Sequence, residues 1–525
     1  MSTAARPASA QSQSAAEAST SSLVNRLWSY CELLRHSGVS TLDYVEQLTY
    51  LLFLKMADER DKIFRPLAEK RGLKVERLVP EGLDWPSLTA LSAEPLIDHY
   101  ERILRTLGEQ RGTMLSEVFA KAQNKIHDPA VLDRLIKDLI DRHVWSQTGA
   151  DVKGDAYEGL LQRGAEDRKT GAGQYFTPRP LIDAMVDCLE PQLGESVTDP
   201  ACGTGGFLIA AYAHLVERFG DEGMLSDPDA ARDLQSGKIT GYELVRETAR
   251  LALMNMLLHN IGTSDGAPLI QIQDSLAKPP NHTYDIVLAN PPFGVGSVTG
   301  EAYSSRGDFW AHSTNKQLNF LQHIYTLLKT GGRAAVVLPD NVLFEGGAGT
   351  EIRRRLLQTC NVHTMLRLPT GIFYANGVKA NVLFFHKIPP RPSGRPATDQ
   401  LWVYDFRTDQ RFTLKQRPLR REHLDDFIKS YHSGNGDFQN RIANDRFRAY
   451  SYDELIHRDK LNLDLTVLQS RGGAGSASLA TPDLLAQQIV DDLEEALAQF
   501  SIVAQALKGG SVPQGPGVAQ QDMNT

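Results

Sequence analysis

The residues with the clearest chemical potential are Asn290-Pro291-Pro292-Phe293, which combine a carboxamide, two prolines and an aromatic ring. They follow residues 284–289, an apolar run that predicts a buried strand of a parallel sheet. Ligands of such sheets bind beyond the carboxyl ends of the strands, so these four residues are expected at a ligand site. An Asn-Pro pair also begins many ordinary turns, and this simpler interpretation stays open.

These residue types suit the transfer of a group to a planar amino nitrogen. An exocyclic amine such as adenine N6 is a poor nucleophile because its lone pair is delocalised into the ring. The Asn290 side-chain oxygen and the Pro291 carbonyl could each accept one N–H, which would turn the lone pair toward a methyl donor. The two prolines fix φ and remove two N–H donors, so the turn is stiff and presents carbonyls. Phe293 offers a face for a base taken out of its stack. The catalytic candidates are therefore Asn290, Pro291, Pro292 and Phe293.

A glycine-rich turn forms the second candidate site, within Asp199-Pro200-Ala201-Cys202-Gly203-Thr204-Gly205-Gly206. A short strand precedes it and an apolar helix follows, which is the order of the first βα unit of a nucleotide-cofactor fold. Its glycines allow positive φ and a close approach of the backbone to a ligand. The spacing differs from the dinucleotide pattern G-x-G-x-x-G, so NAD is disfavoured. Cys202 is interpreted as packed beneath the turn rather than as a nucleophile.

Two acidic residues follow later strands of the same predicted sheet. Glu243 ends a strand at 238–242, where a carboxylate typically accepts the two ribose hydroxyls of a nucleoside. The distance from the glycine turn exceeds the usual ~20 residues, so an inserted loop and helix are expected at 221–234. Asp274 ends a third strand and could accept the amine of a cofactor adenine. A surface glutamate and a turn aspartate are the simpler alternatives.

The segment Gln174-Tyr175-Phe176-Thr177-Pro178-Arg179 precedes an apolar helical stripe. Thr177 is expected as its N-cap and Pro178 as its first helical residue. The stretch itself does not decide whether Tyr175 and Phe176 also contact a ligand. Farther along, Asp340 and Asn341 are expected on the rim of the same cleft, and the arginines at 353–355 are expected to be largely exposed.

The overall pattern predicts an α/β fold with a doubly wound parallel sheet, preceded by an all-helical N-terminal domain. Strands at 366–369 and 382–385 are expected to close the sheet as a hairpin. A C-terminal helix at 481–507 carries a coiled-coil seam, for which a partner helix is favoured over packing on the body. The expected division is a disordered N-terminus (1–22), the helical domain (23–150), the catalytic domain (151–390), a mixed extension (391–470), and a linker, partner-binding helix and flexible tail (471–525).

Composition narrows the function classes. The 525 residues are 41% hydrophobic and 23% charged, as in an ordinary globular protein. The net charge of −8 means that any DNA contact must come from local patches or from a partner. Four widely spaced cysteines suggest no metal site and suit a reducing cytoplasm. No signal sequence and no apolar run near the ~20 residues of a membrane span is visible.

These motifs, in this order, resemble those of an amino-group DNA methyltransferase; residues 368–373 and 381–385 add to the likeness. From about residue 23 to 510 the chain is similar to the modification subunits of type I restriction-modification enzymes. The resemblance implies a class I methyltransferase fold, S-adenosylmethionine as donor and adenine N6 in double-stranded DNA as acceptor. It also implies assembly of two such subunits with one specificity subunit and a restriction subunit. The candidate cofactor-binding residues are Gln174, Tyr175, Phe176, Thr177, Pro178, Arg179, Asp199, Ala201, Gly203, Thr204, Gly205, Gly206, Glu243 and Asp274.

Other functions remain open at this stage. A similar turn serves enzymes that methylate glutamine in proteins or guanine in ribosomal RNA. A catalytically idle scaffold that clamps DNA for a nuclease is a further alternative. Cytosine C5 transfer is disfavoured because it requires a Pro-Cys nucleophile, and this dipeptide does not occur. No segment resembles a base-reading module, so the choice of DNA sequence is expected to lie in a partner.

Overall fold

The computed structural model describes residues 41–70, 77–109, 112–145, 177–219, 238–293, 303, 306–373, 378–407, 412–413, 417–434 and 436–467. Several expectations fall outside these residues. They are the disordered N-terminus, the contacts of Gln174, Tyr175 and Phe176, the insertion at 221–234, and the linker, helix and tail after 470.

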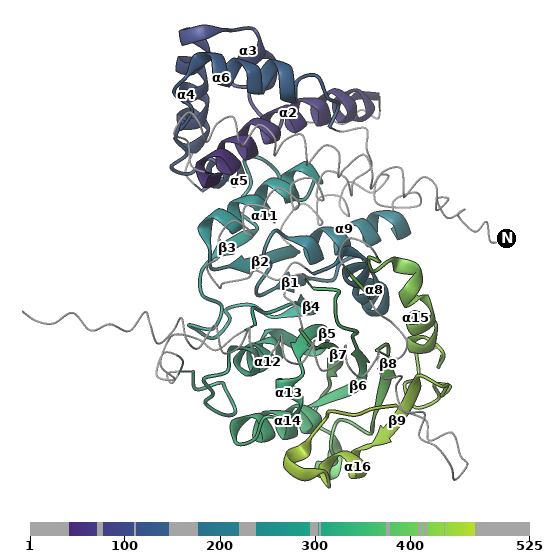
Figure 1. Cartoon of the computed structure of the whole chain (residues 1–525). Coiled ribbons are helices and arrows are strands. Elements are labelled where there is room, and N and C mark those ends of the chain that lie inside the picture. The colour runs from purple at the N-terminus through teal and green to yellow at the C-terminus, as the bar shows by residue number, and fades with distance from the viewer. Residues whose placement is uncertain are drawn as a thin grey trace, which may run out of the picture.

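The described residues form a helical N-terminal part and one mixed sheet covered by helices (Figure 1). The sheet has nine strands in the order β3-β2-β1-β4-β5-β7-β6-β8-β9. β7 and β9 run antiparallel to the other strands. The strands are β1 (Val197–Asp199), β2 (Ile239–Glu243), β3 (Ile270–Ile272), β4 (Tyr284–Ala289), β5 (Leu328–Pro339), β6 (Cys360–Arg367), β7 (Ala380–Lys387), β8 (Gln400–Asp405) and β9 (Phe447–Ser451).

Helices cover both faces of the sheet, as the doubly wound prediction requires. The main helices around the sheet are α8 (Arg179–Leu189), α9 (Gly206–Phe219), α11 (Arg246–Leu258), α12 (Lys316–Leu327), α13 (Asn341–Phe344), α14 (Ala348–Thr359), α15 (Asp425–Tyr431) and α16 (Tyr452–Ile456). Alternate side chains of β4 enter two different cores. Ile286 and Leu288 pack in the core that includes α8, α9 and α11, whereas Val287 and Ala289 pack in the core with α12 and α14. This double burial explains the unbroken apolar run before Asn290.

The N-terminal part consists of α2 (Thr41–Lys70), α3 (Trp85–Thr89), α4 (Ala93–Glu109), α5 (Met114–Val118), α6 (Pro129–Asp133) and the π-helical turn Arg134–Ile140. It docks on α11, as Figure 1 shows. The buried guanidinium of Arg250 on α11 donates to Glu46 and Tyr50 of α2 and to the carbonyl of Ala120. All residues of α11 from Thr248 to Leu258 are buried, so the helix serves as core for both parts.

The predicted late hairpin is present, because β6 and β7 pair antiparallel next to β5. Its first strand lies earlier than the predicted 366–369, since β6 ends at Arg367. The sheet continues past residue 390, where the sequence suggested a boundary: β8 pairs with β6, and β9 with β8. Residues 391–467 also contribute short helical turns, Pro392–Gly394, Arg421–Leu424 and Asp459–Leu461. The described residues of this C-terminal extension therefore add two strands to the sheet of the catalytic domain.

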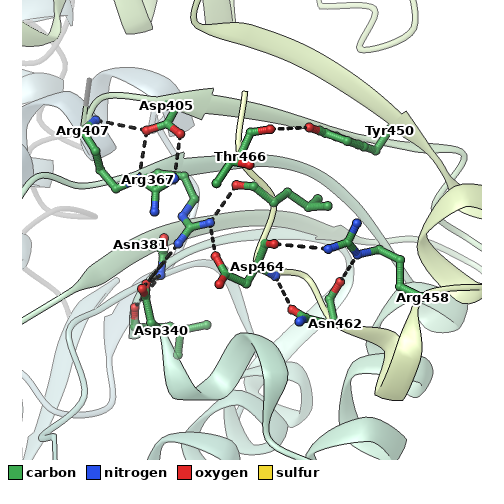
Figure 2. Close-up of polar contacts among 12 residues, drawn as sticks. Asp340, Arg367, Asn381, Asp405, Arg407, Tyr450, Arg458, Asn462, Asp464 and Thr466 are labelled. Atoms are coloured by element: carbon green, nitrogen blue, oxygen red, sulfur yellow. Dashed lines mark hydrogen bonds and ion pairs between the residues drawn. The ribbon is translucent and has the colours of Figure 1, made fainter. Parts of the chain in front are cut away.

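The last described residues return to the carboxyl edge of the sheet (Figure 2). There the fully buried Arg367, at the end of β6, donates to Asp464 at 2.5 Å and to the carbonyl of Leu465 at 2.7 Å. It also lies 3.4 Å from Asp340, which accepts a hydrogen bond from Asn381 at 2.7 Å. Asp340 is thus engaged in a polar cluster that fastens residues 464–465 to β5, β6 and β7.

One expectation about α14 is wrong. Arg354 and Arg355 are exposed, as predicted, but Arg353 is 1% exposed. Its guanidinium donates to four carbonyls, those of Val342, Glu345, Lys460 and Leu461, at 2.7–3.0 Å. A run of three arginines looked like a solvated face, but a helix turns 100° per residue, so one of the three points to the core. Arg353 ties α13 and the turn at 459–461 to α14.

We expect Arg353→Met to lower the free energy of unfolding by about 2–4 kcal/mol, because it leaves several buried carbonyls without donors. Arg354→Met, the matched change one residue later, should cost less than about 0.5 kcal/mol because that side chain is exposed. Urea unfolding of both variants measures the difference. Equal stability of the two would contradict the role given to Arg353.

Candidate active site

Three carboxylates and one carboxamide lie at the carboxyl ends of parallel strands, at one edge of the sheet. Asp199 ends β1, Glu243 ends β2, Asp274 follows β3 and Asn290 follows β4. β1 pairs with β2 on one side and with β4 on the other, and β2 pairs with β3. The structure therefore brings together the residues that the sequence placed at the strand ends.

The glycine turn leaves β1 and is anchored to its neighbours by short contacts. Gly203 and Gly205 adopt positive φ, 56° and 88°, which explains the need for glycine there. A Cβ at Gly203 would meet nothing within 4 Å, so its backbone borders open space. The carbonyl of Thr204 accepts a hydrogen bond at 3.0 Å from the buried side chain of Asn255 on α11. The turn is thus held by α11 at Thr204 and borders open space at Gly203.

Glu243 is linked directly to this turn. Its Oε2 accepts the Gly203 N–H at 3.1 Å and its Oε1 accepts the Val245 N–H at 2.8 Å. Burial raises the pKa of Glu243, although these backbone N–H groups oppose the shift. Each carboxylate oxygen can accept a second hydrogen bond. Glu243 is therefore held by the backbone and keeps acceptor capacity on both oxygens.

Asp199 lies beneath the turn rather than on it. The side chain is 1% exposed and accepts the N–H of Ala201 at 2.9 Å. Burial, reinforced by the nearby charge of Glu243, raises the pKa of Asp199 to about 8. Cys202 is buried next to it and packs against Gly241, as expected for a structural thiol. Asp199 and Cys202 are thus buried under the glycine turn, and Ala201 is held there by its hydrogen bond to Asp199.

Asp274 holds two donors in the structure. Its Oδ1 accepts the N–H of Leu276 at 2.9 Å, and its Oδ2 accepts the hydroxyl of Tyr303 at 3.0 Å. Burial and the carboxylate of Asp274 raise the pKa of Tyr303 to about 12, so the hydroxyl remains a donor. The neighbouring Ser275 donates to the carbonyl of Pro200 at 2.6 Å, which joins the ends of β3 and β1. Tyr303 was not singled out from the sequence.

The segment before α8 connects the two candidate sites. Helix α8 begins at Arg179, one residue later than predicted, and Thr177 does not cap it. Instead, the Thr177 hydroxyl accepts a hydrogen bond from Nδ2 of Asn290 at 2.8 Å. Arg179, two residues on, donates to the carbonyl of Gly206 at 3.3 Å. The Asn-Pro-Pro-Phe turn and the glycine turn therefore share one support.

The Asn-Pro-Pro-Phe turn is held at two further points. The carbonyl of Pro292 accepts a hydrogen bond at 2.8 Å from Nε2 of Gln317 in the first turn of α12. The ring of Phe293 packs edge-on against Phe373 from the β6–β7 connection, with ring centroids 6.3 Å apart. Nδ2 of Asn290 donates to Thr177, and Oδ1 is the acceptor atom of the same amide. That Asn290 Oδ1 and the Pro291 carbonyl form an acceptor pair for an amine remains a prediction.

The residues that hold these groups, above all Gln317 and Asn255, were not predicted from the sequence. A usable signal existed for Gln317. It precedes Leu321 and Ile324 at helical spacing, so a polar side chain stands at the start of a core-facing stripe. Buried amides need partners, and such a position marks a required hydrogen bond.

The strand order β3-β2-β1-β4-β5-β7-β6, with the glycine turn after β1 and the acidic end of β2, defines a class I S-adenosylmethionine-dependent methyltransferase fold. The family model described as N-6 DNA Methylase matches residues 148–466, and the one described as HsdM N-terminal domain matches residues 23–139. The chain belongs to the N-6 DNA methylases and, within them, to the methylase subunits of type I restriction enzymes.

Three comparisons support this membership. The chain is 38% identical to the methylase subunit of the type I restriction enzyme EcoKI from Escherichia coli K12, over 92% of this chain and 95% of that protein. It resembles the structure of a modification subunit assigned to a type I restriction enzyme from Vibrio vulnificus YJ016, with a TM-score of 0.69, 26% identity and coverage of 86% and 97%. A chain from a structure that describes complex assembly and conformational transition of the type I restriction-modification system has a TM-score of 0.63, 25% identity and coverage of 94% and 99%.

Thr177→Val should lower the rate of methyl transfer about tenfold, because it removes the acceptor that fixes the Asn290 amide. Thr177→Ser keeps the hydroxyl and should retain turnover close to that of the unmodified chain. Transfer of tritiated methyl groups to duplex DNA, with the chain in its natural complex, measures both. A valine variant as active as the serine variant would contradict this contact.

The buried carboxyl of Asp199 should make stability depend on pH. Its pKa is higher in the folded chain than in the unfolded one, so its contribution is complete at low pH and is lost as the pH rises toward 8. Asp199→Asn should therefore lose less thermal stability between pH 5 and pH 8, by a few kcal/mol at about 1.4 kcal/mol per pKa unit. Asp98→Asn, at an exposed position of α4, is the control. An unchanged pH dependence in Asp199→Asn would refute the assignment.

Proposed function

We propose that this chain, a methylase subunit by family, transfers a methyl group from S-adenosylmethionine to N6 of an adenine in double-stranded DNA. One observation carries the proposal. An Asn-Pro-Pro-Phe turn stands beside an open glycine turn at the carboxyl edge of the sheet, and Thr177 and Arg179 join the two. The acceptor groups for an amine thus lie next to the cradle for the donor.

The donor site would be formed by the glycine turn and the neighbouring acidic residues. S-adenosylmethionine, when bound, would supply an electrophilic methyl group on a sulfonium. The positive φ of Gly203 and Gly205 lets the backbone approach this cofactor closely. Glu243 would accept the ribose hydroxyls, since its carboxylate is already fixed by two backbone N–H groups. Asp274 would accept the adenine amine of the cofactor beside the Tyr303 hydroxyl. Residues 174–176 lie outside the described residues, and we propose that they contact the cofactor as well.

The acceptor site would orient the target amine for direct in-line transfer. Asn290 Oδ1 and the Pro291 carbonyl would accept its two N–H groups, which holds the nitrogen and frees the lone pair. The same two oxygens would stabilise the positive charge that develops on the nitrogen as the methyl group arrives. Phe293 would stack on the flipped base, and its ring is fixed for this task by Phe373. Stacking and two hydrogen bonds can offset the few kcal/mol that flipping costs.

Partners would supply what this chain lacks. A net charge of −8 gives no general attraction to DNA, so a specificity subunit would provide sequence choice and much of the DNA contact. We propose two modification subunits for each specificity subunit, joined by a restriction subunit that cleaves unmodified DNA. Among the helices described, none has the length and apolar character needed to cross a membrane. We place the complex in the cytoplasm with the host DNA that it would protect.

Other amino-group acceptors and an idle scaffold are not favoured, because the family is that of N-6 DNA methylases. Copurification of the chain with its partners, followed by mapping of methylated adenines in the host genome, tests the proposal. We expect one defined recognition sequence to be methylated at adenine. Methylation of protein or RNA instead of DNA would overturn it.

Asn290→Ala should lower turnover by roughly 10²–10³, the usual loss when one aimed polar group is removed from a reaction centre. Because Asn290 is not among the proposed cofactor contacts, binding of S-adenosylmethionine, measured by calorimetry, should change little. Tritium transfer to duplex DNA provides the rate. Turnover close to that of the unmodified chain would exclude Asn290 as the group that holds the amine.

A further inference from the structure

The Asn-Pro-Pro-Phe turn poses a mechanical problem that its own sequence does not solve. Prolines 291 and 292 have no N–H groups, so the backbone cannot fix the turn by donating hydrogen bonds at these positions. Their φ angles are fixed, and the direction of the Pro291 carbonyl then depends on the ψ angles between Asn290 and Phe293. Anchors at both ends of this short segment would restrict those angles.

Two such anchors are visible. At the near end, Asn290 follows β4, whose residue Ala289 pairs with Val336 of β5, and its side chain contacts Thr177. At the far end, Nε2 of Gln317 donates to the Pro292 carbonyl at 2.8 Å. A carbonyl can only accept, so the amide nitrogen of Gln317 must face it. The direction of the Pro292 carbonyl is therefore set from α12.

Gln317 is itself firmly placed. Its side chain is 2% exposed, and its backbone N–H donates to Oδ1 of the N-cap residue Asn315 at 2.9 Å. Asn315 in turn donates to Glu345 at 2.6 Å, which links α12 to the residue after α13. Leu321 and Ile324, farther along the same face, are buried in the core between α12 and the sheet. A rigid helix thus presents a single donor to the turn.

We infer that Gln317 is a positioning residue for methyl transfer. By holding the Pro292 carbonyl, it fixes the turn so that the Pro291 carbonyl faces the target amine and Phe293 faces the base. This inference rests on the proposed function, since it assigns a task to Gln317 within that reaction. Gln317 lies on α12 and outside the predicted donor site, so its effect is on the rate of transfer and not on cofactor binding.

The same helix offers a matched control. Gln322 is also a buried glutamine, 1% exposed, but it holds the N–H and the carbonyl of Ala311 at 3.0 Å each, away from the turn. Gln322 also donates to Oδ1 of Asn319 at 3.4 Å, so Gln322→Met removes three hydrogen bonds, whereas Gln317→Met removes one. A purely structural role for both residues would therefore make Gln322→Met the more damaging change in every assay.

The experiment compares Gln317→Met and Gln322→Met in the complex copurified with its partners. Gln317→Met should lower kcat about tenfold, as expected for the loss of one hydrogen bond that positions the reacting groups. Its KM and its calorimetric Kd for S-adenosylmethionine should remain within about twofold of the values for the unmodified complex. A twofold change corresponds to less free energy than the loss of one hydrogen bond. Gln322→Met should lower the melting temperature more but kcat less. A kcat for Gln317→Met equal to that of the unmodified chain would overturn the inference, as would loss of activity in proportion to melting temperature in both variants.

A second variant tests whether the hydrogen-bond donor of Gln317 is the group that matters. Gln317→Glu keeps the side-chain shape but replaces the donor with a carboxylate oxygen, which repels the Pro292 carbonyl. Its kcat should be at least as low as that of Gln317→Met, and full activity would overturn the inference. The unmodified complex and Asn290→Ala are assayed alongside. If the unmodified complex does not methylate adenine in DNA, the proposed function fails; if it does and Gln317 variants remain fully active, only the role of Gln317 fails.

Discussion

The arrangement of the site depends on a turn that lacks N–H donors at two successive positions. Prolines give the turn stiffness and present its carbonyls, but they also remove the usual means of fixing a loop by its own backbone. Side chains from outside the turn fix its position instead. Thr177 contacts the side chain, Gln317 the second carbonyl and Phe373 the aromatic ring. Each comes from a different element, so the geometry of a four-residue turn reflects the packing of the whole domain.

Pre-organisation of this kind matters because the proposed catalytic groups, an amide and a peptide carbonyl, are modest ones. Neither is charged, and their effect on an amine depends on direction more than on strength. Fixed dipoles do not need to reorient during the reaction, which is the main source of electrostatic catalysis in enzymes. The parallel strands supply the coarse placement, since β1 to β4 end at one edge. Hydrogen bonds and packing from the surrounding side chains then fix the precise positions of the groups in the turn.

Much of the fold, and the position of the candidate site at the strand ends, could be predicted from the sequence. The apolar run before Asn290, the glycine turn and the acidic residues at 243 and 274 gave the sheet and the order of its functional ends. Local signals were enough because each lies within one strand–turn unit. The supports were not predictable in the same way. Thr177 looked like an N-cap, but it bonds a residue 113 positions away, and Arg353 looked exposed although it holds four carbonyls. Such contacts depend on which elements meet in space, and a single sequence does not show that.

The position of α11 has a consequence for the modularity of the chain. One side of this helix supports the glycine turn through Asn255, and Arg250 on the same helix holds the N-terminal helices through Glu46 and Tyr50. Because every residue from Thr248 to Leu258 is buried, removal of the N-terminal helices would uncover an apolar surface and take away the acceptors of Arg250. The helical part and the sheet therefore share α11 as a common core element. An excised catalytic half would lose the contacts that hold this helix, and with it the support that Asn255 gives to the loop proposed to bind the methyl donor.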